Sequence, residues 1–391
     1  MNLILFDHQH CDNLLPLTFT RPSGEIRVGI MTIREKWEHY TGSQVSYMTR
    51  DYLAKKYPLV QSEDNLLVRG CLLPTRELVD AILALKPDET LAGEGEILAS
   101  RISRAEHPEK KESAKTIIFK GKYDLVDYPW KIFSLNGQEI EADYKILTHQ
   151  RNSTPLSQTV QVINPENVFV EEGFSGEYFT LNASSGPIYL GRDSEIMEGS
   201  VIRGPFALGE HSVVKLGAKI YGPTTIGQHS RVGGEVNNSV ILGYSNKGHD
   251  GFLGNSVLGE WCNLGADTNN SNLKNNYAEV KIWNYPENHF VKTGLQFCGL
   301  IMGDHSKCGI NTMFNTGTVV GVSANIFGSG FPRNFIPSFS WGGGAGFMDY
   351  KPDKAFETME LVMERRGVNL TDIDREIYQY IFENTAKYRK Y

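Results

Sequence analysis

The sequence predicts an α/β N-terminal domain of Rossmann type, followed by a left-handed parallel β-helix and a C-terminal helical segment. Three observations lead to this fold class: a repeat with a period of six residues, short apolar runs that precede it, and two amphipathic stretches that follow it. We expect the α/β domain over 1–150, a linker over 151–187, the β-helix over 188–345 and the C-terminal helices over 350–391.

The six-residue repeat is the strongest signal in the chain. Every sixth residue of its first stretch is aliphatic, and the residue four positions later is mostly small: the aliphatic positions are Leu190, Ile196, Ile202, Leu208, Val214, Ile220, Ile226 and Val232. Neither the 3.6-residue period of a helix nor the 2-residue period of a strand produces this pattern. A solenoid with one short strand per hexapeptide does, because each aliphatic side chain then points into a narrow prism.

The repeat changes phase twice along the chain. It resumes at Phe252 and again at Met302, and the stretches 238–251 and about 269–297 interrupt it. Long excursions from a regular repeat are where function concentrates. We therefore expect the functional residues of the solenoid to lie at these two interruptions.

The flanking segments have their own patterns. Apolar runs at 3–6, 45–48, 66–68 and 116–119 predict buried strands, and residues 74–85 predict a helix with Thr75 as its N-cap. The glycine-rich sequence at 340–346 predicts a flexible break. Beyond it we expect helices at about 353–366 and 371–388, which would cap the solenoid or dock on a neighbour.

Composition excludes several classes of protein. The net charge of the 391-residue chain is −7 and its basic residues are dispersed, which argues against nucleic acid as a partner. No apolar stretch is long enough for a membrane span, and the N-terminal apolar run is too short for a signal peptide. The five cysteines include no CxxC pair, so we expect buried thiols in a cytoplasmic protein and assign no metal ligand.

The stretch from 244 to 270, YSNKGHDGFLGNSVLGEWCNLGADTNN, is the most informative motif. It resembles the acetyltransferase half of the bifunctional UDP-N-acetylglucosamine diphosphorylase/glucosamine-1-phosphate N-acetyltransferases. It is closer still to the archaeal-type two-domain sugar-1-phosphate nucleotidylyltransferase/acetyltransferases. That family pattern has a lysine-rich turn, a histidine, a Tyr-Leu-Gly coil and an asparagine-rich loop. The resemblance implies acetyl-CoA as the co-substrate and an amino-sugar phosphate as the acceptor.

The same resemblance implies roles for individual residues. His249 would be the general base that takes a proton from the acceptor amine, a role that suits a side chain titrating near neutral pH. Asn263 would hold the sugar phosphate, Ala266 would meet the acyl donor through its backbone, and Gly328 would lie near the pantetheine arm. The alternative for His249 is a surface-loop histidine without a function.

Two departures from the family pattern concern the acceptor. The tyrosine that contacts the acceptor is Phe252 here, which keeps the ring and loses the hydroxyl donor, and a family lysine falls on Asn237. Asn272 belongs to the asparagine-rich loop and is a further candidate for substrate binding. Lys247, Lys274 and Lys281 are nearby cations that could replace the missing lysine at the phosphate, and the sequence does not choose among them. We include Lys247 with the candidates for substrate binding.

A second resemblance lies at residues 14–37, LLPLTFTRPSGEIRVGIMTIREKW. It is similar to the opening of sugar-phosphate nucleotidylyltransferases, in Pro-Leu-Thr and Thr-Arg-Pro. Arg21, Arg27 and Lys36 are therefore candidates for binding nucleotide phosphates. The family's glycine-rich loop is replaced by DHQHCDN, and its Mg²⁺-binding aspartate falls on Cys71. Because nucleotidyl transfer depends on such charge neutralisation, these losses argue against conventional catalysis by this degenerate domain. Mg²⁺ binding there stays open, and a purely structural domain is the alternative.

Together these resemblances imply an enzyme of nucleotide-sugar synthesis. The β-helix would transfer acetyl from acetyl-CoA to a glucosamine-1-phosphate-like acceptor. The N-terminal domain would bind the sugar nucleotide or transfer a nucleotide from UTP or dTTP. The family also implies a homotrimer with sites between neighbouring prisms. The alternative is a non-catalytic scaffold or regulator that keeps a sugar-nucleotide pocket.

Overall fold

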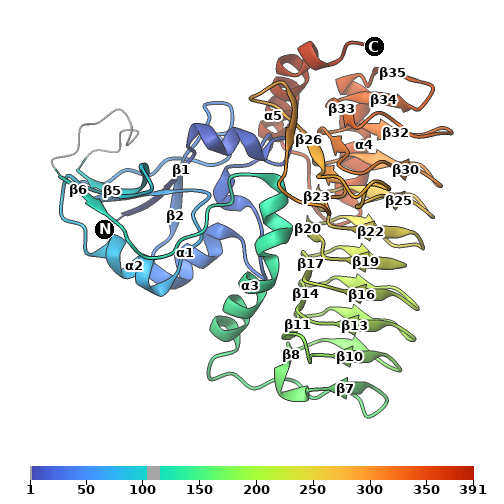
Figure 1. Cartoon of the computed structure of the whole chain (residues 1–391), viewed down its shortest axis with the longest axis horizontal. Coiled ribbons are helices and arrows are strands. Elements are labelled where there is room, and N and C mark those ends of the chain that lie inside the picture. The colour runs from blue at the N-terminus through green and yellow to red at the C-terminus, as the bar shows by residue number, and fades with distance from the viewer. Residues whose placement is uncertain (1, 104–114) are drawn as a thin grey trace. The chain divides into compact units, whose positions relative to one another are not determined.

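The structure, a computed structural model, describes residues 2–103 and 115–391. The chain forms two compact units (Figure 1). The α/β unit consists of Met1–Leu14, Thr20–Ile26 and Met31–Tyr128, and the solenoid unit consists of Leu15–Phe19, Arg27–Ile30 and Pro129–Tyr391. Two short segments of the N-terminal region thus belong to the solenoid unit, which the expected boundary at residue 150 did not include.

The α/β unit has a mixed sheet with the strand order β2-β1-β3-β5-β4-β6 among the described residues. The strands β1, β2 and β3 are parallel, and β5 runs antiparallel to β3 and β4. The strands are β1 (Asn2–Phe6), β2 (Val45–Met48), β3 (Asn65–Arg69), β4 (Glu89–Gly93), β5 (Glu96–Ile102) and β6 (Lys115–Ile118). The four apolar runs therefore predicted the positions of strands correctly. The expected burial was wrong for β6, an edge strand whose residues are mostly exposed, and β4 and β5 were not predicted.

Two helices of this unit begin at threonine caps. Helix α1 (Ile33–Thr41) has a capping box, in which the Thr32 side chain accepts from the Glu35 backbone N–H and the Glu35 carboxylate accepts from that of Thr32. Helix α2 (Arg76–Leu83) starts at Thr75, whose hydroxyl accepts from the Leu78 backbone N–H, as the sequence predicted. Short 3₁₀ segments, Gln9–Leu14 and Ser23–Glu25, connect the elements.

The solenoid unit is a triangular prism of about ten turns over residues 161–342. In Figure 1 its short strands stack as rungs, one coil above the next. Within the solenoid unit they form three parallel sheets, which we name after the strands of one coil: the β20 sheet, the β21 sheet and the β22 sheet. Parallel pairing in register between successive coils satisfies the backbone, as a solenoid requires. The predicted β-helix is therefore confirmed.

The strands of the three sheets are two to four residues long. The β20 sheet contains β8 (Val168–Val170), β11 (Ile188–Leu190), β14 (Phe206–Leu208), β17 (Thr224–Ile226), β20 (Val240–Gly243), β23 (Val257–Glu260), β28 (Ile301–Met302), β31 (Val319–Val320) and β33 (Phe335–Ile336). The β21 sheet contains β9 (Ser175–Gly176), β12 (Glu195–Ile196), β15 (Val213–Val214), β18 (Arg231–Val232), β21 (Asn246–Lys247), β24 (Asn263–Leu264), β29 (Lys307–Cys308), β32 (Asn325–Ile326), β34 (Ser340–Gly343) and the antiparallel β35 (Gly346–Asp349). The β22 sheet contains β7 (Gln161–Ile163), β10 (Thr180–Asn182), β13 (Val201–Arg203), β16 (Lys219–Tyr221), β19 (Glu235–Asn237) and β22 (Phe252–Gly254).

The aliphatic positions of the repeat fill the prism. All eight, from Leu190 to Val232, are at most 1% exposed and belong to one continuous core cluster. The small residues of the repeat occupy the corners, where their hydroxyls bond to backbone groups that the strands leave unpaired. Ser212, for example, donates its hydroxyl to the Gly227 carbonyl at 2.9 Å and accepts from the Ser230 N–H at 3.1 Å. The period of six residues thus arises because each strand needs one aliphatic side chain for the interior and each corner needs one small residue.

Three stretches differ from the sequence prediction. Residues 161–182, expected within a linker, form the first strands of the solenoid, because their short apolar runs lack the regular spacing of later coils. Residues 238–251, expected as an excursion, form a coil with strands β20 and β21, and the phase slip only marks a shorter corner. Residues 340–346, expected as a flexible break, form most of the β34–β35 hairpin.

The second interruption does leave the prism. Strand β25 (Asn269–Asn270) pairs with β30 (Met313–Phe314), and the chain then forms the antiparallel hairpin of β26 (Lys281–Asn284) and β27 (His289–Lys292). Three helices pack on the solenoid: α3 (Pro129–Thr148) along β14, β17, β20 and β23, and after the last coil α4 (Pro352–Glu364) and α5 (Asp372–Asn384). The two C-terminal helices confirm the sequence prediction, and the hydroxyl of Thr371 caps α5 by accepting from the Asp374 backbone N–H.

Candidate functional site

The corner between the β21 sheet and the β22 sheet bears His249. The residue lies in the turn between β21 and β22 and its side chain is exposed. The two corners directly after it in sequence, stacked above it, contain Ala266 and Ile310, since the Asp267 N–H donates to the Asp250 carbonyl at 3.0 Å and the Asn311 N–H to the Ala266 carbonyl at 2.8 Å. We name this row of turns the His249 corner.

Gly328 lies in the next turn of the same row. It follows β32, which pairs with β29, and its backbone φ of +101° is a conformation that glycine adopts without strain. A Cβ placed there would meet no atom within 4 Å, so the surface above it is open. The structure therefore brings His249, Ala266 and Gly328 onto one edge of the prism. Three steps of about 4.8 Å separate the first turn from the last, which gives about 14 Å.

Phe252 and Asn272 come together beside this corner. A Cβ on Gly254 would lie 2.5 Å from the tip of the Phe252 ring and 2.8 Å from the Asn272 side-chain nitrogen. Glycine at 254 thus makes room for both side chains. The Asn272 amide also donates to the Asn255 side-chain oxygen at 2.8 Å.

The asparagine-rich loop has a structural role in addition. Strand β22 is the last strand of its sheet, so its outer backbone edge lacks a strand partner. The Asn269 side chain accepts from the Phe252 N–H at 2.8 Å, and the Asn270 amide accepts from the Gly254 N–H at 2.9 Å and donates to its carbonyl at 3.1 Å. These asparagines replace the missing strand.

Lys247 occupies an interior position of the prism, in register with Val232. Its ammonium group donates to the carbonyls of Gly233 at 2.9 Å and His249 at 2.6 Å. Burial lowers the pKa of Lys247 to about 8, although Asp250 and Asp267 favour its charged form. Its contact with substrate stays a prediction. The two other lysines that the sequence proposed lie in the second interruption, where Lys274 donates to the Glu279 carbonyl.

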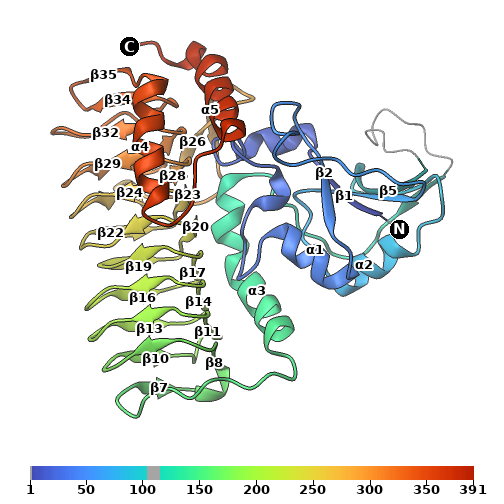
Figure 2. The ribbon, with the colours of Figure 1, turned by 180° about the vertical axis from the view of Figure 1, so that it is seen from behind.

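Asn263 lines a cleft of about 370 Å³ on the outer face of the β21 sheet. Figure 2 shows α4 crossing the rungs on this side of the solenoid. The lining residues are Arg231, Tyr244, Asn246, Trp261, Cys262, Asn263, Lys307, Val362, Arg365 and Arg366. Sequence reasoning missed the four cations among them. We use the name basic pocket for the site formed by these cations and two asparagines: Arg231, Lys307, Arg365, Arg366, Asn246 and Asn263. Their only signal is register, because residues far apart in sequence become neighbours when the coils stack.

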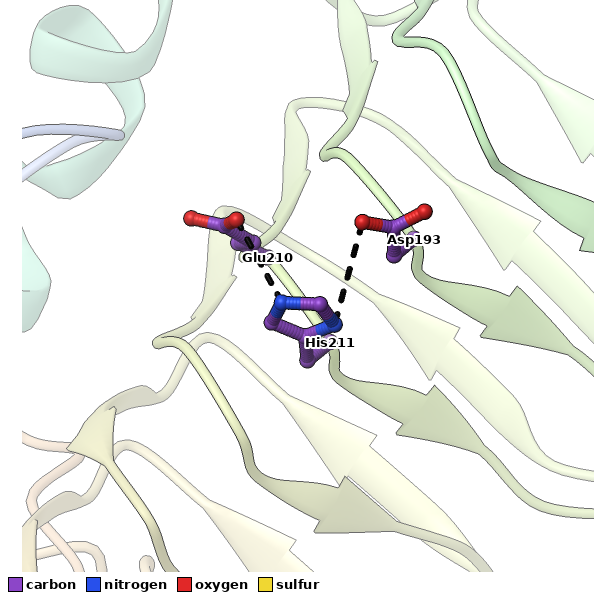
Figure 3. A group of neighbouring side chains, drawn as sticks. All are labelled: Asp193, Glu210 and His211. Carbon is purple, nitrogen blue, oxygen red and sulfur yellow. Dashed lines mark ion pairs between the residues drawn. The ribbon is translucent and has the colours of Figure 1, made fainter. Parts of the chain in front are cut away.

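A ladder of stacked rings forms the corner between the β20 sheet and the β21 sheet. Its rings belong to His211, His229, Tyr244, Trp261 and His305, with neighbouring centroids 4.2–5.9 Å apart. At its lower end His211 lies 4.0 Å from the Asp193 carboxylate and 3.4 Å from that of Glu210 (Figure 3). These three side chains are exposed, and exposed groups of this kind are common without a metal ion.

The nucleotide-binding candidates lie in different surroundings. Arg21 is 4% exposed and Lys36, on α1, is 1% exposed, both within the α/β unit. Arg27 belongs to the solenoid unit, where its guanidinium donates to the Ile30 carbonyl and to the Gln228 side chain. Their role in nucleotide binding stays a prediction.

The position of the expected Mg²⁺-binding aspartate holds a buried thiol. Cys71 is hydrogen-bonded to Cys11, and this bond, with the nearby charge of Arg69, lowers the pKa of Cys71. Arg69 itself is fully buried and contacts Glu96, His8 and His10. Mg²⁺ prefers oxygen ligands, and a thiol pair beside a guanidinium does not suit it. We therefore assign no Mg²⁺ step to this chain.

Residues 3–152, less than half of the chain, match the family model described as sugar nucleotidyl transferase. A bifunctional sugar-1-phosphate nucleotidylyltransferase/acetyltransferase from Sulfurisphaera tokodaii is 28% identical over 220 residues, which are 56% of this chain and 48% of that protein. The bifunctional protein GlmU of Methanocaldococcus jannaschii is 34% identical over 87 residues, 22% of this chain and 21% of that protein. The chain thus spans about half or less of the length of these curated relatives.

Among solved structures, an Arabidopsis UDP-N-acetylglucosamine acyltransferase is 14% identical to this chain. The match covers 55% of this chain and 80% of that chain, with a TM-score of 0.24. Within the described residues, no helix has the length and apolar composition to cross a membrane. The chain combines a sugar nucleotidyl transferase region with a hexapeptide β-helix, and its distant homologues are bifunctional sugar-1-phosphate nucleotidylyltransferase/acetyltransferases.

Proposed function

We propose that the solenoid unit transfers acetyl from acetyl-CoA to the amino group of an amino-sugar phosphate such as glucosamine-1-phosphate. The observation that supports this most is the row formed by His249, Ala266 and Gly328 on one edge of the prism. A linear thioester lying along this edge would pass Gly328 and Ala266 and present its acyl group near His249. The sequence similarity to the archaeal bifunctional enzymes agrees with this assignment.

In this reaction His249 acts on the acceptor. Its imidazole removes a proton from the amine as the nitrogen forms a bond to the thioester carbonyl carbon. The carbon–sulfur bond then breaks, and the CoA thiolate takes up the proton that His249 holds. An exposed imidazole with a free approach from solvent can reach such an acceptor. Phe252 and Asn272, which lie together over Gly254, would contact the sugar on the other side of the corner.

The same edge also supports assembly into a homotrimer. Leu216 and Ile310 lie in its turns and are 65% and 70% exposed, and Phe331 beyond the last turn is 55% exposed. A second copy would cover these apolar side chains. Light scattering after gel filtration at micromolar concentration would give the mass of three chains. A mass of one chain would contradict this arrangement.

For the N-terminal domain we propose binding of a sugar nucleotide, and nucleotidyl transfer from UTP or dTTP is the second candidate. The match to the sugar nucleotidyl transferase model favours nucleotidyl transfer. The thiol pair and Arg69 at the expected metal position favour binding of a sugar nucleotide without transfer. Pyrophosphate release from UTP or dTTP with a sugar 1-phosphate and Mg²⁺ separates the two. The alternative for the whole chain is a scaffold or regulator without enzymatic activity. For an enzyme, the family resemblance implies a cytoplasmic location.

The acetyltransferase proposal is tested by the release of CoA thiol. The wild type should release thiol from acetyl-CoA only when glucosamine-1-phosphate is present. The variant His249→Ala should lose about 10²- to 10⁴-fold in turnover, the usual contribution of a general base. His289→Ala, which changes an exposed histidine of the β26–β27 hairpin, is the matched control. Equal rates in all three proteins would contradict the role of His249.

A further inference from the structure

The basic pocket is built from side chains in register on four neighbouring rungs. Arg231 pairs with Asn246, Asn246 with Asn263, and Asn263 with Lys307, so two amides lie between two cations on the outer face of the β21 sheet. At about 4.8 Å per rung the row is about 14 Å long. Arg365 and Arg366, at the end of α4, close the pocket from outside.

The positive charge of this pocket is not balanced by neighbouring carboxylates. The whole pocket lies within residues 115–391, and none of its lining residues is acidic. In the part of the chain that the structure describes, none of its four cations forms an ion pair. Burial and repulsion by Arg231 and Arg365 lower the pKa of Arg366, and burial lowers the pKa of Lys307 to about 8. Cations held together in this way gain stability when an anion binds.

The shape of the pocket favours a phosphate group over a nucleobase. Tyr244 and Trp261 are its aromatic residues, and each is stacked between neighbours of the ring ladder. Both faces of each ring are therefore covered, and only ring edges reach the pocket. A base would need an uncovered face for stacking, whereas guanidinium groups bind phosphate oxygens in pairs.

The position of the pocket connects it to the His249 corner. Asn246 is three residues before His249, so its Cα lies at most about 11 Å away. Asn263, the residue that the sequence motif assigns to the sugar phosphate, lines the pocket itself. Ala266 and Gly328, where the acyl donor is expected, belong to the same corner as His249, and Ala266 is three residues after Asn263.

We propose that the basic pocket binds the phosphate group of the amino-sugar phosphate acceptor, with Arg231 and Arg366 as its principal ligands. This inference rests on the proposed acetyltransferase function and adds residues that the sequence motif does not include. Arg366 comes from the C-terminal helical segment, to which the resemblance does not extend. Cations at a helix C-terminus also complement the helix dipole. That role does not require the 3.4 Å contact of the Arg366 guanidinium with the Asn246 side chain inside the pocket.

The test is binding measured by titration calorimetry on the full chain, with glucosamine-1-phosphate, glucosamine and CoA as separate ligands. The double variant Arg231→Gln/Arg366→Gln should raise the Kd for glucosamine-1-phosphate about 10- to 100-fold. It should leave the Kd for CoA unchanged. Arg366→Lys, which keeps the charge, should recover part of the affinity. The control is Arg192→Gln, which removes an exposed arginine near the start of the solenoid, and circular dichroism monitors folding of every variant.

Two results would overturn the proposal. In one, the double variant binds CoA more weakly and glucosamine-1-phosphate normally, so that the pocket would serve the phosphates of the donor. In the other, the folded double variant binds both ligands like the wild type. If the double variant fails to fold, each single variant is compared with Arg366→Lys by the same criteria. Binding that depends on the pocket without any acetyl transfer would support the pocket and contradict the proposed function.

Discussion

Two groups of cations, one around Arg69 in the α/β unit and one in the basic pocket of the solenoid unit, are held in opposite ways. In the α/β unit Arg69 is fully buried and has an ion pair with Glu96 and contacts with two histidines, and Arg21 and Lys36 are buried as well. In the solenoid unit Arg231, Arg365 and Arg366 line an open cleft whose lining includes no carboxylate. A cation already neutralised by the protein has little charge left for a ligand. Of these two groups, the basic pocket is therefore the one whose charge is available to an anionic ligand.

This difference agrees with the sequence motifs of each unit. The N-terminal region lacks the expected glycine-rich loop and the expected Mg²⁺-binding aspartate, and the structure shows a thiol pair and a paired arginine near that aspartate position. The solenoid retains an accessible histidine and has gained cations from a helix beyond the repeat. Each unit resembles a family with a known type of reaction. The side chains of the solenoid unit fit that reaction better than the side chains of the α/β unit do.

The largest expected effect concerns the paired cation Arg69 of the α/β unit and its contribution to stability. Arg69→Met removes the partner of Glu96 and of two histidines from a buried position, and the free energy of unfolding should fall by about 3 kcal/mol. Urea unfolding followed by circular dichroism measures it. Arg76→Met is the matched control, because its pair with Asp80 is exposed and should contribute less than about 1 kcal/mol. Equal losses in both variants would show that Arg69 is not a structural cation.

A smaller effect concerns Lys247, the cation inside the prism. Its pKa of about 8 lies below the unfolded value of 10.5, so between these values the unfolded chain binds more protons. The contribution of Lys247 to stability therefore rises with pH across this window, by less than about 3 kcal/mol in total. The groups that favour its charged form are Asp250, Asp267 and Cys308. Lys247→Met should lose this part of the pH dependence between pH 8 and 10, measured by urea unfolding at each pH.

An unchanged slope in that variant would show that the Lys247 ammonium is not held away from solvent. Lys307 also has a pKa lowered to about 8, but it stays in both proteins. The difference between wild type and Lys247→Met therefore isolates the one group.

The smallest expected effect concerns the basic pocket of the solenoid unit and the salt dependence of phosphate binding. Because Arg231 and Arg366 are only partly buried, salt should screen the attraction of the basic pocket for a phosphate dianion. The Kd for glucosamine-1-phosphate should rise severalfold between 50 and 300 mM NaCl, on the order expected for partly exposed charges. In Arg231→Gln/Arg366→Gln the dependence should flatten. A steep dependence retained by the double variant would place the attracting charge elsewhere.

Much of the fold follows from the sequence, because a period of six has one structural explanation. The repeat from Leu190 to Val232 predicted the prism and its interior, and the cap at Thr75 predicted the start of a helix. The first coils, at 161–182, were missed since their apolar residues lack that spacing. The coil at 238–251 was taken for an excursion because a shorter corner shifts the phase without leaving the prism.

The candidate site divides along the same line. Residues within one motif, such as His249 and Ala266, can be proposed from sequence because the motif is continuous. The basic pocket joins Arg231, Lys307 and Arg366 through strand register and the placement of α4. Neither is encoded in a local pattern. Only the stacked coils show that residues 76 positions apart, 231 and 307, share one face.

The most direct test of the central claim is the rate of thiol release from acetyl-CoA by the wild-type chain, with and without an amino-sugar phosphate. We expect thiol release that requires glucosamine-1-phosphate and saturates with it, and mass spectrometry should detect the N-acetylated sugar phosphate as the product. Glucosamine without the phosphate should be a poor acceptor. Release that is the same with and without the acceptor, or no release from a folded chain that binds both ligands, would contradict an acetyltransferase site at the His249 corner.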